Sequence, residues 1–178
     1  AMLARVLTLR FALGEFDPPS AVPFAALGPR DVGTAAAKRL ALRAAIEGIV
    51  LLQNRAQTLP LTRIARPLGS ARPVLAVLGP LADTAEALLG NYHGHPSRVT
   101  TPLKALQASL EGKATVVWAQ GCHVTREDPM LLSKARSAAR TADAVVLVLG
   151  IDKAVEAELK DRPTLELPRA QRRLLDRA

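Results

Sequence analysis

Short apolar runs alternate with helix-like segments along the second half of the chain. Three runs, each too short for a helix and closed by small or polar residues, predict strands at residues 74–79, 114–119 and 144–150. The apolar spacing and the capping residues predict helices at residues 83–89, 102–110 and 129–142 and from Pro168 onward. Strands that alternate with helices indicate an α/β fold, a three-layer sandwich whose mainly parallel sheet is flanked by helices.

The first half of the chain has a weaker pattern. Residues 3–13 predict a short helix that Gly14 caps, and residues 17–33 contain several prolines, which is typical of a linker. Apolar positions three and four apart predict a helix with one buried face from about residue 34 to residue 47. The branched run at residues 49–52 then resembles a short buried strand.

Composition narrows the class of protein. The 178 residues are 49% hydrophobic, which excludes a disordered chain, and no apolar stretch is long enough to cross a bilayer. Cys122 is the one cysteine, so the chain has no internal disulfide. The net charge of +8 raises the question of a nucleic-acid partner. The arginines are scattered, however, and no aromatic residues are interleaved with them, so we expect a solvated basic surface and no nucleic acid.

Other common sites are not indicated. The residues after Gly79 lack the glycine pattern of a dinucleotide-binding loop, and no phosphate-binding loop with a following lysine occurs. His93 and His95 lack a third ligand, so we predict no metal site. Ser97 and Cys122 lack the sequence context of a catalytic nucleophile.

The loop after the third predicted strand holds several carboxylates at residues 151–162. In parallel sheets, ligands bind beyond the carboxyl ends of the strands, which is where this loop begins. From the residues alone, a solvated charged face is the alternative interpretation.

Seven motifs in order along the chain carry a resemblance to a known family. They lie at residues 10–17, 48–54 with 59–61, 77–80, 89–96 with 101–103, 121–122, 142–146 and 156–171. Together they resemble glycoside hydrolase family 3, nearest to its β-xylosidase branch, around the C-terminal α/β-sandwich domain. The resemblance implies the end of a preceding (β/α)8-barrel domain at residues 1–16, a linker at 17–33, and a partial sandwich domain at 34–178. The last helix has no cap, so we expect a fragment that is incomplete at its C-terminus.

The resemblance also implies chemistry. Retaining glycosidases use two carboxylates about 5 Å apart, a nucleophile and an acid/base. In this family the nucleophile is an aspartate of the barrel, and the acid/base is a glutamate of the second domain. By position we take Glu156 as the candidate acid/base and Glu158 as the alternative. Weaker candidates for substrate binding are Tyr92, Asp161 and Arg162. For these, packing of the tyrosine under its loop and an ion pair between Asp161 and Arg162 are the structural alternatives.

Many family members have glycine where Leu159 stands, although the xylosidase branch often lacks it. The implied function is that of part of a retaining β-glycosidase that hydrolyses terminal non-reducing β-linked sugars. The implied enzyme type is β-xylosidase or β-glucosidase, active in the breakdown of xylan or related polysaccharides. The expected substrates are β-linked oligosaccharides and aryl glycosides, and the expected partner is the missing barrel domain of the same polypeptide. We expect no cofactor, no membrane partner and no activity of the isolated chain. The alternative is a non-catalytic carbohydrate-binding or interaction module of the same fold. No signal-peptide pattern opens the sequence, which leaves localisation open.

Overall fold

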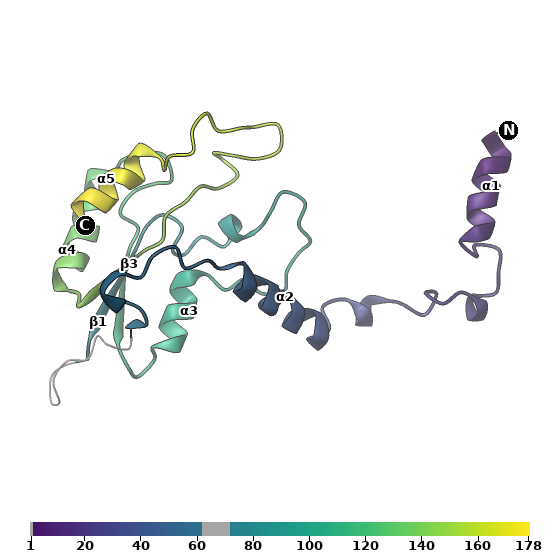
Figure 1. Cartoon of the computed structure of the whole chain (residues 1–178), viewed down its shortest axis with the longest axis horizontal. Coiled ribbons are helices and arrows are strands. Elements are labelled where there is room, and N and C mark those ends of the chain that lie inside the picture. Colours follow the sequence, from purple (N-terminus) through teal and green to yellow (C-terminus); the bar gives the residue numbers. More distant parts are fainter. Residues whose placement is uncertain (1, 62–71) are drawn as a thin grey trace. The chain divides into compact units, whose positions relative to one another are not determined.

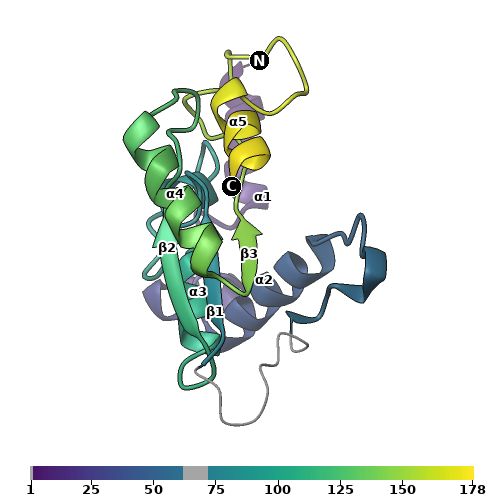
Figure 2. The same ribbon diagram turned by 90° about the vertical axis from the view of Figure 1, so that its left-hand side faces the viewer.

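The computed structural model describes residues 2–61 and 72–178, and these form two compact units that divide after Ala56. The unit that begins at Gln57 contains a parallel sheet of three strands in the order β2-β1-β3. The strands are β1 (Val74–Leu78), β2 (Thr115–Ala119) and β3 (Ala144–Leu147). Leu75 lies opposite Val116 on one side and Ala144 on the other, and the arrows in Figure 2 point the same way. The three predicted strands are thus confirmed.

Side chains of β1 alternate between the two faces of the sheet. Leu75 and Val77 pack with Leu103 of helix α3 (Pro102–Ser109) on one face. Ala76 and Leu78 pack on the other face, against helices α4 (Pro129–Thr141) and α5 (Arg169–Arg177). Figure 2 shows α4 and α5 on the near side of the strands and α3 behind them. The unit is therefore the α/β sandwich of three layers that the alternating pattern predicts.

Helices α3 and α4 begin where the sequence predicts. The Thr101 hydroxyl accepts a hydrogen bond from Lys104 N at the start of α3, and the Asp128 carboxylate accepts hydrogen bonds from Met130 N and Leu131 N at the start of α4. Each cap satisfies amide groups that the helix leaves without a partner, and proline follows each cap at the first helical position.

The helix predicted at residues 83–89 is wrong. Only the 3-10 turn Glu86–Leu88 forms there. Asp83, at the predicted helix start, accepts a hydrogen bond from the buried Thr101 hydroxyl at 2.7 Å. Because its carboxylate is used across the loop, it does not cap a helix at its own position.

The unit that ends at Ala56 contains α1 (Met2–Ala12) and α2 (Ala35–Gly48). Gly14 adopts φ +74° after α1, and Glu15 N donates to Arg10 O, which confirms the predicted glycine cap. Two short 3-10 turns, Pro19–Ala21 and Pro29–Asp31, lie in the proline-rich stretch before α2.

Two predictions of burial in this unit are wrong. Helix α2 has no buried residue, and residues 49–52 are exposed and form no strand. A strand needs a neighbour for its backbone groups, and the described residues of this unit contain no strand. The apolar residues occur at the predicted positions, but the described residues of this unit provide no surface against which they could be buried. In the described residues, no helix is long and apolar enough to span a membrane.

Candidate functional site

Glycines close all three strands of the sheet at its carboxyl edge, as Gly79, Gly121 and Gly150. Gly79 adopts φ +120°, and a Cβ atom there would lie 2.2 Å from the Val148 carbonyl oxygen. A Cβ atom on Gly121, at φ +77°, would lie 2.6 Å from the Leu174 side chain. These glycines let the strand ends and α5 approach closely, so the loops after the strands begin from one tightly packed edge.

Asp152 organises the first part of the carboxylate-bearing loop, residues 151–162. Its side chain accepts a hydrogen bond from Ala154 N, and its carbonyl oxygen accepts from Val155 N and Glu156 N. This short-range pattern is typical of an aspartate that initiates a turn. In Figure 1 the segment after β3, in yellow-green, makes a long excursion before it reaches α5.

Two antiparallel hydrogen bonds between Ala157 and Lys160 form the outer part of the loop. Each joins an N–H to a carbonyl oxygen at 3.0 Å, and they enclose a turn made by Glu158 and Leu159. Lys160 also donates from its ammonium group to the Ala154 carbonyl oxygen. The loop therefore has a defined backbone conformation at the position of the candidate glutamates.

The two candidate glutamates have different surroundings. Glu156 forms an ion pair with Arg162, with 2.7 Å between Oε2 and Nε. Glu158 is exposed at the turn, and no hydrogen bond or ion pair engages its carboxylate among the described residues. Leu159, beside it, is fully exposed and has φ +62°. This left-handed conformation favours glycine, which gives a physical reason for the glycine that many family members have here.

The structure brings only part of the predicted site together. Arg162 pairs with Glu156, whereas no ion pair joins it to Asp161 among the described residues; Asp161 is exposed. Tyr92 lies in a different loop, between the Glu86–Leu88 turn and α3, where its side chain is 86% exposed. It does not pack under its loop, and the described structure records no contact between it and the glutamates.

Sequence reasoning missed the role of Gln171. This α5 side chain is completely buried, and its Oε1 accepts a hydrogen bond from Gly150 N at 2.8 Å. Its Nε2 donates to the carbonyl oxygens of Gly150 and Val124, both at 2.7 Å. The signal in the sequence was a polar residue on the face of α5 that also carries Ala170 and Leu174.

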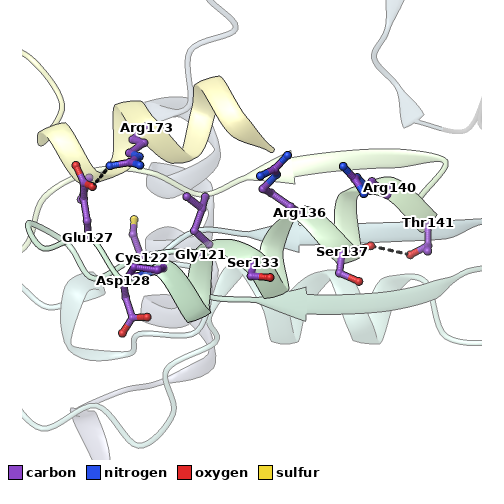
Figure 3. A pocket seen from close by; sticks show the side chains of 13 residues that line it. Gly121, Cys122, Glu127, Asp128, Ser133, Arg136, Ser137, Arg140, Thr141 and Arg173 are labelled. Carbon is purple, nitrogen blue, oxygen red and sulfur yellow. Dashed lines mark hydrogen bonds and ion pairs between the residues drawn. The ribbon is translucent and has the colours of Figure 1, made fainter.

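A groove of about 470 Å³ runs along α4 beside α5 (Figure 3). Arg136 and Arg140 of α4 line it, together with Arg173 of α5, which is paired with Glu127. None of residues 151–162 lines this groove, so it is separate from the carboxylate-bearing loop. Burial, with a smaller effect of the Glu127 charge, raises the pKa of the Cys122 thiol in its wall to about 11. A thiol that stays protonated at neutral pH is a poor nucleophile.

Candidate metal ligands do not cluster in the described residues, where no group of three histidine, cysteine or acidic side chains is suitably placed. Three of the four arginines of α5 form ion pairs: Arg169 and Arg173 pair with Glu127, and Arg172 pairs with Glu166.

The model of the glycosyl hydrolase family 3 C-terminal domain matches residues 49–178. This match covers most of the chain. The chain belongs to glycosyl hydrolase family 3. Beta-D-xylosidase 1 of Arabidopsis thaliana is 42% identical over 98% of this chain, and beta-xylosidase/alpha-L-arabinofuranosidase 2 of Medicago sativa subsp. varia is 42% identical over 92%.

Solved structures of a β-xylosidase and a β-glucosidase share the fold. A family 3 exo-β-xylosidase in complex with a xylobiose aziridine probe has a TM-score of 0.73 and 34% identity, and covers 87% of this chain. A β-glucosidase from Erythrobacter marinus has a TM-score of 0.72 and 31% identity, and covers 92%. The chain spans about one fifth of the length of the curated relatives and 19% and 24% of these two structures.

Proposed function

We propose that this chain is the acid/base-bearing domain of a retaining β-glycosidase that acts on terminal β-linked sugars, xylosides first. A barrel domain of the same polypeptide supplies the nucleophilic aspartate and most of the contacts to the sugar. The observation that carries the proposal is the family match over residues 49–178, with its ordered, carboxylate-bearing loop at the carboxyl edge of the sheet. The xylosidase names of the curated relatives support xylosides as the first substrates to test.

The reaction assigns two tasks to one carboxyl group. It protonates the leaving oxygen while the nucleophile attacks the anomeric carbon, and it then takes a proton from the water that releases the sugar. Such a group must present a carboxyl oxygen to substrate from outside the barrel. A turn at the tip of a well-ordered loop fits this task.

The surroundings of the two glutamates support Glu158 for this role over Glu156, the candidate that position alone favoured. The Glu156 carboxylate is occupied by Arg162, and this ion pair bridges the two flanks of the turn. Glu158 extends from the turn with its carboxylate free of protein partners in the described structure. In this assignment Glu156 and Arg162 hold the turn, and Glu158 meets the substrate.

A chimera tests the assignment. Residues 49–178 replace the matching segment of the Arabidopsis β-D-xylosidase 1, and the rest of that protein, more than four fifths of its length, stays in place. With an aryl xyloside of poor leaving ability, we expect Glu158→Ala to lower kcat by about 10²–10⁴-fold. The loss should be much smaller with a dinitrophenyl leaving group, which needs no protonation. Azide should restore turnover of the dinitrophenyl substrate with release of xylosyl azide, because azide attacks the glycosyl-enzyme without base assistance.

Glu156→Ala is the matched variant, two residues away in the same loop. It should lower turnover of good and poor substrates alike, without rescue by azide. The reverse pattern would make Glu156 the acid/base. If the chimera is active and the loss of turnover in both variants is independent of the leaving group, this loop has no acid/base role.

The 178-residue chain by itself should not hydrolyse aryl β-xylosides. Only one of the two required carboxylates is proposed to lie in it, and the barrel supplies the other. Detectable turnover that Glu158→Ala abolishes would overturn this division of roles. Binding of xylo-oligosaccharide by the chain, with an inactive chimera, would favour a non-catalytic carbohydrate-binding module.

A further inference from the structure

Hydrogen bonds from the Gln171 amide connect α5 to the start of the carboxylate-bearing loop. It bonds both backbone groups of Gly150, the N–H through Oε1 and the carbonyl through Nε2. This pairing reproduces the way a neighbouring strand would bond Gly150, at a point beyond the end of β3 at Leu147. The side chain thus extends the ordered backbone from the sheet into the loop.

The third hydrogen bond gives the amide a fixed orientation. Nε2 also donates to the Val124 carbonyl oxygen, which lies in the loop after β2. Rotation of the amide by 180° would direct Nε2 toward the Gly150 N–H and Oε1 toward two carbonyl oxygens. Because only one orientation satisfies all three backbone groups, the amide couples the loops after β2 and β3 to a single position of α5.

Helix α5 is itself firmly anchored. Ala170 and Leu174, on either side of Gln171 in the sequence, are buried in the core cluster that contains Leu78. Glu127, in the segment after Val124, pairs with Arg169 and Arg173 of α5. The Gln171 side chain is therefore held from both ends, by its helix and by the backbone groups that it bonds.

We propose that Gln171 is a positioning residue that sets where the loop of residues 151–162 leaves the sheet, and with it the placement of the turn at Glu158. Gly150 lies two residues before Asp152, whose hydrogen bonds begin the fold of the loop. A shift at Gly150 is passed to the turn through this short, hydrogen-bonded segment. The catalytic consequence rests on the proposed function, whereas the anchoring of the loop does not.

Hydrogen exchange with mass spectrometry tests the anchor in the 178-residue chain. Gln171→Met keeps the volume but removes all three hydrogen bonds. Gln107→Met is the matched control, because Gln107 is exposed on α3. We expect exchange in peptides covering residues 148–162 to rise about tenfold in Gln171→Met, with a smaller rise in β1 peptides and none in the control. An equal rise in the loop and in β1 would show a general loss of stability and overturn the proposal, as would an unchanged loop.

Turnover by the chimera tests the consequence. Gln171→Met should lower kcat by about 10–100-fold, with KM within about twofold, since a misplaced group costs turnover more than binding. Gln171→Glu keeps one acceptor but directs a carboxylate at two carbonyl oxygens until it is protonated. It should therefore recover part of its turnover at acid pH, as Gln171→Met does not. Unchanged kcat with a loosened loop would overturn the positioning role. An inactive wild-type chimera would instead count against the proposed function, and the exchange result would still decide the anchor.

Discussion

Leu159 has the least favourable backbone conformation in the loop that carries the two glutamates. At φ +62° its Cβ atom crowds the backbone, at a cost of about 1–2 kcal/mol for a residue other than glycine. The fully exposed side chain gains nothing from burial in return. The turn is therefore held by the hydrogen bonds between Ala157 and Lys160 and by the ion pair between Glu156 and Arg162.

Leu159→Gly should relieve this strain. We expect a net gain of about 1 kcal/mol or less in unfolding free energy, because glycine also raises the entropy of the unfolded chain. Exchange of the Ala157 and Lys160 amide protons should slow. Leu159→Ala is the matched control, since it keeps the Cβ atom and should change neither quantity. Faster exchange in the glycine variant would show that the leucine side chain, and not the backbone, holds the turn.

Asp128 gives the fold a dependence on pH. The hydrogen bond from Leu131 N, then the one from Met130 N and the charges of His123 and Arg126, outweigh desolvation and hold the pKa of this carboxyl below its ordinary value. A carboxyl whose pKa is lower in the folded state stabilises the fold above its unfolded pKa of about 3.9. That stabilisation is lost as the pH falls through the lower, folded value.

Asp128→Ala should therefore lower the Tm at neutral pH, and the difference from the unchanged chain should narrow as the pH falls below about 4. Asp128→Asn keeps an oxygen that accepts the two cap hydrogen bonds, so it should retain part of the neutral-pH stability and lose the pH dependence. Thermal melts between pH 3 and 7 measure both effects. If the Tm difference between Asp128→Ala and the unchanged chain stays constant from pH 3 to pH 7, the Asp128 charge does not stabilise the fold.

At the scale of elements, the sheet depends on close contact between loop backbones at its carboxyl edge. Gly79 follows β1, and Val148 N donates to Leu78 O, which continues the pairing of β1 and β3 beyond the strands. A Cβ atom at Gly79 would overlap the Val148 carbonyl group, which is backbone and cannot rotate away. The start of the carboxylate-bearing loop would have to move.

Gly79→Ala should thus destabilise the chain by several kcal/mol and shift the Val148–Gly150 amides. Gly112→Ala is the matched control, because Gly112 also has positive φ, at +73°, but no atom lies within 4 Å of the added Cβ. Its cost should be limited to about 1 kcal/mol of backbone strain. Urea denaturation of both variants gives the comparison, and equal costs would contradict a steric origin for the effect at Gly79.

The elements that the sequence predicted correctly are those whose signal is local. Apolar runs closed by small or polar residues indicated β1, β2 and β3, and the apolar spacing with its capping residues indicated where α3 and α4 begin. Hydrogen bonds between residues far apart in the sequence could not be predicted from such local signals. The hydrogen bond from Thr101 to Asp83 removed a predicted helix start, and Gln171 bonds residues that lie 21 and 47 positions away.

The candidate site shows the same difference between local signals, which the sequence reveals, and contacts between side chains, which it does not. The resemblance led to the loop and to both glutamates, because the motif is a property of neighbouring residues. It ranked Glu156 first by position alone, and it gave no sign of the ion pair that Arg162 forms with Glu156 across the turn. The exposure of Tyr92 was not predicted either, because an aromatic side chain in a loop can equally pack against the protein or extend into solvent.

At the scale of the whole molecule, the unit that ends at Ala56 carries apolar residues that nothing in the unit covers. Leu40 and Ile46 of α2 are exposed, and so are residues 49–52, of which Leu52 is 91% exposed. Surfaces of this kind are buried against other protein or promote association. The curated relatives are about five times as long as this chain, so they have additional protein that could cover the matching residues.

We therefore expect the 178-residue chain to associate in a concentration-dependent way. The double variant Val50→Lys, Leu52→Lys should reduce this association without loss of the sheet, because neither side chain belongs to the core clusters of β1. Val32→Lys is the matched control: Val32 is 80% exposed but lies outside the run, so it should have little effect. Light scattering over a concentration series measures the change. In the chimera, the rest of the relative should cover the run, and the double variant should then cost stability instead. The contrary result is a monodisperse monomer at all concentrations, with the double variant having no effect on either the 178-residue chain or the chimera. It would show that residues 49–52 face solvent in the whole protein as well.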